Sequence, residues 1–115
     1  MIMDYKSECE KFIAWCKPKL GIQTTIRVTL VHTVIKKGAQ STFGYFEPHT
    51  GRIVISCVDR HVMDVLRTLC HEMVHVAQHA QRPLQASDGA TGSQIENEAN
   101  ALAGILLRLY GQDCR

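Results

Sequence analysis

Residues 68–78 read TLCHEMVHVAQ and contain two histidines four positions apart, His71 and His75, with Glu72 directly after the first. Side chains four residues apart on a helix lie about one turn from each other on the same face, so both imidazoles can reach one ion at about 2.0 to 2.1 Å. This spacing therefore predicts a zinc site. The pattern would also arise by chance in roughly 1 to 2% of shuffled versions of this sequence, so the five residues alone do not establish the site.

Two histidines do not complete a catalytic zinc site, which normally has three protein ligands and one open position for water. His79 continues the series, but it lies about 12 Å along the helix axis from His71 and is expected at a rim or in solvent. No histidine follows residue 79, so we expect a carboxylate as the third ligand. The downstream candidates are Asp88, Glu96, Glu98 and Asp113. The two glutamates lie on the firmest predicted element, a helix.

The two glutamates differ in the residue that follows each of them by one helical turn. Glu96 is followed at that distance by Asn100, whereas Glu98 is followed by Leu102. Because ligand histidines almost always have an outer hydrogen-bond partner, we favour Glu96 as the ligand and Asn100 as the partner of a ligand histidine. Ser93-x-x-Glu96 is also a capping box, which would explain Glu96 without any metal.

Two helices are needed to position these side chains. Apolar residues recur at helical period from about residue 61 to 81, and His71 and His75 fall opposite that stripe, facing a surface or a cleft. A last helix is predicted from about 94 to 110, with Gly111 placed to end it. The two stripes are Val62, Val65, Leu66, Leu69, Met73, Val76 and Ala80, and then Ile95, Ala99, Leu102, Leu106 and Leu109.

The first half of the chain predicts a helix followed by strands. Residues 4–17 form an amphipathic pattern, with Asp4 placed to cap it and Pro18-x-x-Gly21 placed to stop it. Strand-like segments follow at 24–31, 41–47 and 52–58. The short link PHTG makes the last two an antiparallel hairpin. The expected fold is a single α+β domain over residues 1–115, with a small, mostly antiparallel three-stranded sheet.

Composition bounds the class of protein. The 115 residues are 45% hydrophobic, and the formal charge is +2, with scattered basic residues, so a nucleic-acid partner is not expected. The N-terminal segment MIMDYKSECEKFIAW has an early acid and no continuous apolar run, so neither a signal peptide nor a membrane span is expected and the predicted location is cytoplasmic. The five cysteines are odd in number and include no C-x-x-C pair, which predicts reduced, buried side chains.

A family resemblance is carried by the same residues. His71-Glu72-x-x-His75, followed by Glu96-x-x-Ala99-Asn100, resembles the gluzincin metallopeptidases, whose third ligand is a glutamate on a later helix. The run IENEANALAGILL is similar to the signature of the ImmA/IrrE-like peptidases of mobile elements and stress responses. The expected order of helix, strands, motif helix and ligand helix is similar to a minimal zincin-like domain.

The resemblance implies a zinc metallopeptidase in which His71, His75 and Glu96 hold Zn²⁺ and Glu72 is the general base. The substrate would be a peptide or protein, paired with FGYF at 43–46 if that segment forms the sheet edge. Phe43, Tyr45 and Phe46 are themselves interpreted mainly as sheet packing. The oxyanion donor is left open among Tyr45, His49, His79 and Tyr110.

Three other interpretations stay open at this point. The chain could be a non-catalytic regulatory or binding module that keeps zinc, or merely the fold, for partner recognition. The last helix could simply cap a helical bundle with no metal bound. A strand cysteine combined with this motif is also typical of peptide deformylases, in which case Cys57 would join the two histidines. Oligomeric state is not predicted by any pattern.

Overall fold

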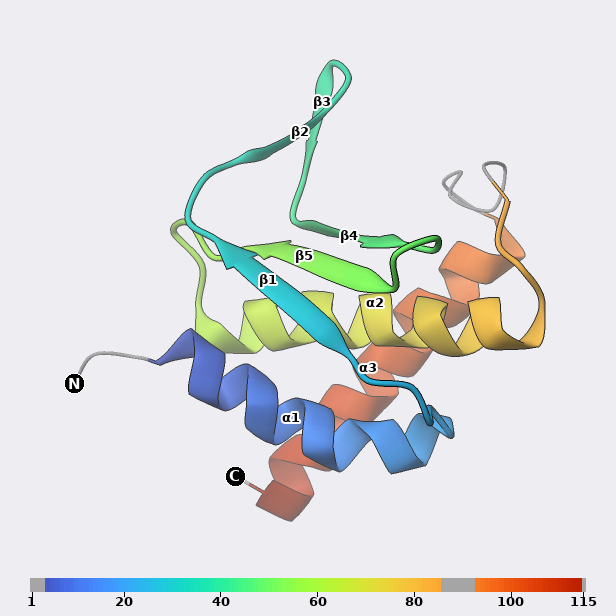
Figure 1. Cartoon of the computed structure of the whole chain (residues 1–115). Coiled ribbons are helices and arrows are strands. Elements are labelled where there is room, and N and C mark those ends of the chain that lie inside the picture. Colours follow the sequence, from blue (N-terminus) through green and yellow to red (C-terminus); the bar gives the residue numbers. More distant parts are fainter. Residues whose placement is uncertain (1–3, 86–92, 115) are drawn as a thin grey trace.

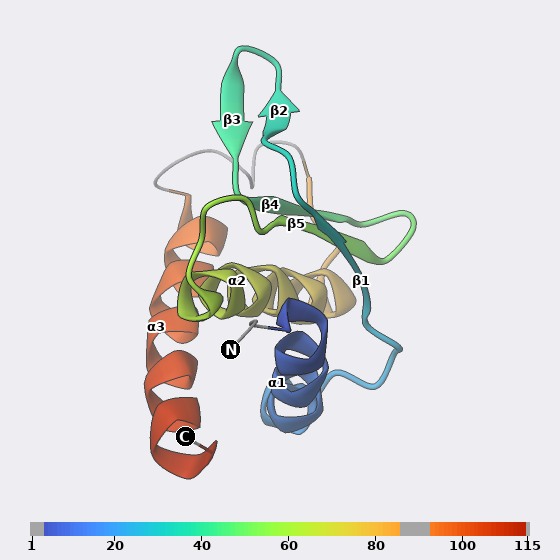
Figure 2. The same cartoon turned by 90° about the vertical axis from the view of Figure 1, so that its left-hand side faces the viewer.

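The computed structural model describes residues 4–85 and 93–114 and has the α+β fold that the sequence predicts. Helix α2 (Val62–Gln81) lies in the middle of the molecule (Figure 1). A small sheet covers one side of α2, while α1 (Tyr5–Leu20) and α3 (Gln94–Cys114) pack against other sides of it (Figure 2). Each face of α2 therefore has a different neighbour.

The sheet contains β1 (Arg27–Val31), β5 (Arg52–Ser56) and β4 (Gly44–Glu47), in that order. β4 and β5 are antiparallel, as predicted, but β1 is parallel to β5. The expectation of a mostly antiparallel sheet was therefore wrong, because the sheet is mixed. The turn between β4 and β5 is encoded locally, whereas β1 reaches β5 through the long connection 32–51, whose path no local pattern specifies.

A second, two-stranded sheet was not predicted. It is the antiparallel hairpin of β2 (Ile35–Lys37) and β3 (Gln40–Thr42), which turns at Gly38 with φ 66°. The hairpin projects from the rest of the molecule (Figure 1). The strand expected at 41–47 is consequently two strands, β3 and β4, separated at Phe43.

Helix α1 begins and ends where its sequence signals lie. The Asp4 side chain accepts a hydrogen bond from the Ser7 backbone N–H at 3.1 Å, which satisfies one of the free donors of the first turn. The helix continues through Pro18 to Leu20, a turn beyond the expected 4–17. Gly21 then adopts the left-handed conformation, φ 69°, that ends helices.

Helix α3 differs from its prediction at its C-terminal end. It runs to Cys114 and does not end at Gly111. Leu109, expected in the apolar stripe, is 40% exposed, and Tyr110 is fully buried instead. The Tyr110 ring packs edge-on against Phe12 at 4.9 Å and Trp15 at 5.2 Å, so aromatic packing against α1 fixes the rotation of α3.

The core lies between the sheet and the three helices. Its members are mostly fully buried apolar side chains of α2, β5, α1 and α3, including Leu66, Leu69, Ile53, Ile55, Phe12 and Ala103. All five cysteines are free, and Cys9, Cys16, Cys57 and Cys70 are buried, as predicted. Among the described residues, none of the helices combines the length and apolar character needed to cross a bilayer.

Candidate metal centre

Helix α2 presents His71 and His75 toward α3. The helix begins after His61, whose ring accepts a hydrogen bond from the Met63 backbone N–H at 3.0 Å, and continues unbroken for 20 residues. The Nε2 atoms of His71 and His75 lie 3.1 Å apart, and the two rings are nearly perpendicular. The spacing of four residues thus brings two imidazole nitrogens to one point.

The first turn of α3 brings Glu96 to the same point. One carboxylate oxygen lies 2.9 Å from His71 Nε2, and the other lies 3.0 Å from His75 Nε2. The Ser93 hydroxyl accepts a hydrogen bond from the Glu96 backbone N–H at 3.1 Å, so the expected capping residue is also present. The Glu96 backbone can therefore take part in the helix cap while its carboxylate approaches the two histidines.

These three side chains form a group that could bind a metal ion, since one ligand atom from each lies within 4.8 Å of the others. Three ligands of a tetrahedral zinc ion, each at about 2.0 to 2.1 Å, would lie about 3.3 Å apart. The two histidine nitrogens are 3.1 Å apart, and each lies 2.9 or 3.0 Å from a different oxygen of Glu96, so these contacts are a few tenths of an ångström shorter. The residues fit such an ion with a small outward adjustment.

Burial favours the neutral form of His71. Desolvation lowers the pKa of His71, and the neighbouring His75 lowers this pKa further. Glu96 and the Asn100 side chain, which accepts a hydrogen bond from His71, act in the opposite direction without reversing the shift. Asn100 is therefore a hydrogen-bond partner of His71, a candidate ligand, as its position in the sequence predicts. A neutral imidazole is the form that binds a metal.

Gln78 is a part of the centre that sequence reasoning missed. Its Oε1 lies 2.7 Å from His75 Nδ1, and its Nε2 donates to Glu98 Oε1 at 2.7 Å and to the Ile95 carbonyl at 3.1 Å. The sequence did contain a signal for this contact, because Gln78 follows His75 by three residues and lies on the same face of the helix. Glu98, the rival candidate for the third ligand, lies outside the group of three ligating residues and accepts from Gln78 instead.

Glu72 is a buried residue of α2, three positions before His75. A full turn before it, Thr68 approaches β4 closely: a Cβ added to Gly44 would lie 2.8 Å from Thr68 Cγ2. At about 100° per residue, Glu72 is rotated around the helix axis by no more than roughly 60° from Thr68 and from His75. Its exposed fraction is 6%. Glu72 is thus a buried residue on the part of α2 that carries Thr68 and His75.

Several predicted candidates do not join the centre. Asp88 lies outside the described residues. Asp113 accepts a hydrogen bond from the Trp15 indole at 3.3 Å, at the far end of α3. Cys57 is 3% exposed in the core and is not part of the ligand group, which removes the cysteine ligand that a deformylase site requires. Tyr110 is a core residue, roughly 21 Å along α3 from Glu96, and is excluded as an oxyanion donor.

The remaining oxyanion candidates lie around β4. His79 makes an edge-on ring contact with Phe46 and accepts a hydrogen bond from the Leu84 backbone N–H at 3.0 Å. Tyr45 alternates with Gly44 and Phe46 along β4, so it points away from α2. His49 lies in the exposed turn between β4 and β5.

The two phenylalanines of the FGYF segment differ in their packing. Phe46 packs on the core, while Phe43 is 63% exposed and covers the Arg60 guanidinium.

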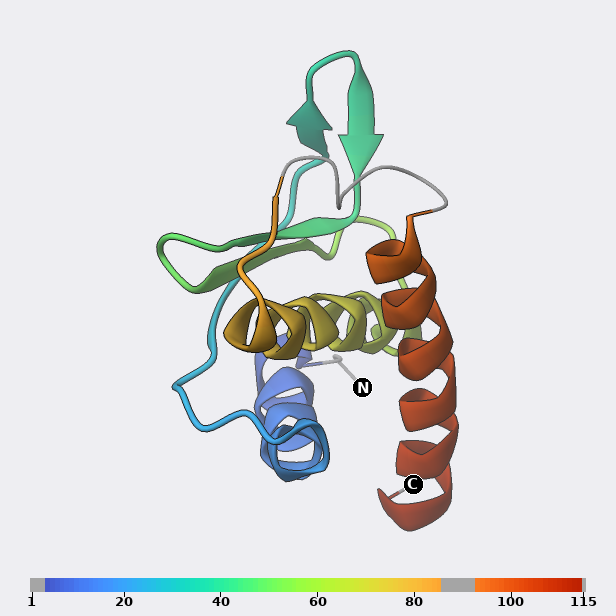
Figure 3. The same ribbon diagram turned by 90° about the vertical axis from the view of Figure 1, so that its right-hand side faces the viewer.

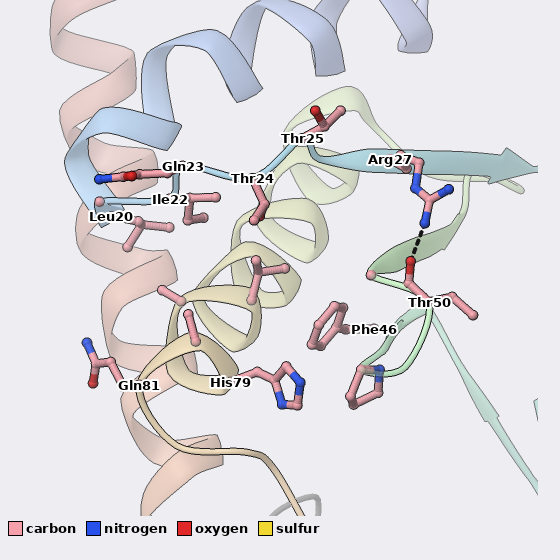
Figure 4. Close-up of a pocket in the computed structure, with 16 residues that line it drawn as sticks. Leu20, Ile22, Gln23, Thr24, Thr25, Arg27, Phe46, Thr50, His79 and Gln81 are labelled. Atoms are coloured by element: carbon pink, nitrogen blue, oxygen red, sulfur yellow. Dashed lines mark hydrogen bonds between the residues drawn. The ribbon is translucent and has the colours of Figure 1, made fainter.

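A cavity of about 760 Å³ lies on another side of α2 (Figure 4). It opens between the end of α1, the start of β1, the turn after β4 and the last turns of α2. Its lining includes Ile22, Thr24, Phe46, Val76, Ala77 and Ala80. None of the three ligating residues lines it. The cavity and the candidate metal centre are therefore separate features of the same helix.

Comparisons of the chain with protein-family models, with curated proteins and with solved structures gave no match.

Proposed function

We propose that this protein is a zinc-dependent metallopeptidase with a minimal gluzincin-type centre. The observation that supports this function best is the meeting of His71, His75 and Glu96, from two helices, around one point. A structural zinc site normally has four protein ligands, and the described residues supply three. A fourth position would remain for water or substrate.

The donor set favours zinc. Two imidazole nitrogens and one carboxylate oxygen are the ligands of several catalytic zinc sites, whereas magnesium and calcium prefer oxygen alone. When bound, zinc supplies a Lewis acid that activates water and polarises a carbonyl. The chain's own residues hold the ion, orient the imidazoles through Gln78 and Asn100, and place a carboxylate beside it.

Glu72 is the proposed general base. Its carboxylate would accept a proton from the attacking water and donate it to the leaving amine of the peptide. The buried position of Glu72 on α2, three residues before His75, supports this role. Its 6% exposure keeps bulk water away from the carboxylate, which strengthens its electrostatic interactions.

The edge strand β4 supports a peptide as the substrate. β4 occupies one end of the strand order, so one side of it has no partner strand in the three-stranded sheet. It crosses above α2 on the side where α3 begins (Figure 3). An extended peptide could add to this edge by main-chain hydrogen bonds and lie across the centre.

A second candidate function is a non-catalytic zinc-binding module. The observation in its favour is the burial of the centre: the His75 side chain is 9% exposed and Glu72 is 6% exposed. A general base must be reached by substrate water, so a centre that stays closed would bind an ion without turnover.

The test is zinc content and peptide cleavage measured on the same purified protein. Wild type should contain one zinc per chain, lose it in the Glu96→Ala variant and cleave members of a diverse peptide library. Glu98→Ala is the matched control and should keep most of its zinc, because Glu98 lies outside the ligand group. Stoichiometric zinc without any cleavage would support the binding module, and wild type without zinc would overturn both functions.

A further inference from the structure

Gln78 is a buried amide that joins α2 to the start of α3. Its exposed fraction is 6%, and its two polar atoms have three partners: His75 Nδ1, Glu98 Oε1 and the Ile95 carbonyl. Two of the three contacts are short, at 2.7 Å. A buried polar group with this many partners is held in one arrangement, because losing them in the interior is costly.

The partners decide which way the amide points. A backbone carbonyl and an ionised carboxylate can only accept hydrogen bonds, so both must face the amide nitrogen of Gln78, which is the donor. The reversed amide would place its oxygen against Ile95 O and the Glu98 carboxylate, leaving three acceptors together. The Gln78 oxygen therefore faces His75.

That orientation selects the tautomer of His75. An amide oxygen only accepts, so His75 Nδ1 must carry the hydrogen and donate it to Gln78 Oε1. In the neutral ring, the lone pair is then on Nε2. His75 Nε2 is the atom that lies 3.0 Å from Glu96 Oε2 and 3.1 Å from His71 Nε2. The lone pair thus points into the ligand group.

We propose that Gln78 is a positioning residue of the metal centre, and that Glu98 and the Ile95 carbonyl act through it to present His75 Nε2 to the ion. This inference rests on the proposed metal site. Its consequence is that α3 supplies both the ligand Glu96 and the acceptors that orient the opposite ligand, all within its first five residues. Docking of one helical turn completes both the ligands and the group that holds them.

The test uses an exchange of donor and acceptor. In Gln78→Glu, two carboxylates face each other at positions 78 and 98, and zinc affinity should fall. In the double variant Gln78→Glu with Glu98→Gln, a carboxylate accepts from His75 and an amide donates to it, so affinity should recover in part. The recovery is partial because the Ile95 carbonyl still faces an oxygen at position 78. Gln78→Met, which has no donor or acceptor, should lose roughly 10- to 100-fold in zinc affinity. Gln81→Met, on the exposed last turn of α2, is the control.

Two readouts are required. Zinc affinity is measured by competition with a chelator, and the nitrogen chemical shifts of His75 are measured by NMR on metal-free protein at a pH where the imidazoles are neutral. Wild type and the double variant should show hydrogen on Nδ1, and Gln78→Met should show a mixture of tautomers. An amide that merely ties two helices together would leave the tautomer unchanged when it is replaced.

The outcomes separate this inference from the proposed function. Gln78→Met with wild-type zinc affinity, or with an unchanged His75 tautomer, overturns the role of Gln78 while leaving the zinc site intact. Wild type that binds no zinc overturns the proposed function, and the tautomer measurement still reports on Gln78. Should Gln78→Met fail to fold, the single and double exchange variants carry the test: a double variant that binds zinc no more tightly than Gln78→Glu overturns the inference.

Discussion

Two sides of helix α2 differ sharply in chemistry. The side toward α3 carries His71, His75 and Gln78, whose polar atoms converge on the first turns of α3. The side toward the end of α1 carries Val76 and Ala80, which line a cavity of about 760 Å³. Large apolar pockets are the usual first hypothesis for a functional site. Here the candidate metal centre lies where two helices meet, and the cavity lies on another side of α2.

The difference shows what each feature needs from the fold. The candidate metal centre requires side chains from two elements to meet within hydrogen-bond distance, which only close packing of α2 against α3 provides. The cavity requires that several elements end near one another without filling the space between them. Substitutions on the two sides should therefore have different consequences.

The largest expected effect is on catalysis, in the variant Glu72→Gln. The amide keeps the shape of the side chain but cannot accept the proton, so peptide cleavage should fall roughly 100- to 10,000-fold. Zinc content should stay stoichiometric, because Glu72 is not in the ligand group. Cleavage rates and metal analysis on one preparation check both statements. Full activity in Glu72→Gln would exclude Glu72 as the base.

The next largest effect is expected on stability, when zinc is removed. At a free zinc concentration about 1,000-fold above the dissociation constant, binding adds about 4 kcal/mol to the free energy of unfolding. A chelator should therefore lower the melting temperature by about 10 °C or more, as followed by circular dichroism. In Glu96→Ala the chelator should change little. An equal fall in both proteins would indicate that the effect does not arise at this centre.

A smaller effect is expected where β4 approaches α2. A Cβ at Gly44 would lie 2.8 Å from Thr68 Cγ2 and 2.9 Å from the Val54 carbonyl oxygen, and the carbonyl belongs to the sheet and cannot move aside. Gly44→Ala should destabilise the protein by about 1 to 3 kcal/mol, measured by urea unfolding.

Gly104→Ala is the matched control for that measurement. The new Cβ would meet nothing closer than Arg67 Nη1 at 3.9 Å, within helix α3. Replacement of a helical glycine by alanine should stabilise the protein by about 0.5 to 1 kcal/mol. If Gly44→Ala were equally harmless, the close contact between β4 and α2 would be wrong.

The smallest effect is expected on the cavity side. Ala80 is exposed and lines the cavity, so Ala80→Leu should change the free energy of unfolding by less than about 0.5 kcal/mol. Zinc content and peptide cleavage should be unchanged. A selective loss of cleavage, with zinc retained, would show that the cavity binds part of the substrate and would remove the contrast between the two sides of α2.

Much of the local structure could be predicted from residue patterns. Asp4 and Gly21 mark the ends of α1, and the apolar period of α2 predicts a helix that begins within a residue of its observed start. Spacing also predicts that His71 and His75 come together with Glu96, and their binding of a metal stays a prediction. These predictions succeed because caps, periods and i,i+4 neighbours depend on residues within about one or two helical turns.

Two of the errors concern contacts between distant segments. The parallel pairing of β1 with β5 and the burial of Tyr110 in place of Leu109 depend on how elements dock. The hairpin of β2 and β3 is local and was missed within the segment predicted as one strand and the residues before it. Gln78 shares a helix face with His75, but its other partners, Ile95 and Glu98, lie 17 and 20 residues away.

The amino-acid pattern alone thus specified which residues could ligate a metal and on which helices they lie. The packing of α3 across α2 decided that Glu96 reaches both imidazoles while Glu98 reaches the amide behind one of them. The physical reason is the range of the forces. Helical periodicity acts between neighbours along the chain, whereas the rotation and register of one helix on another are set by the whole buried interface, including the aromatic contacts of Tyr110 with α1.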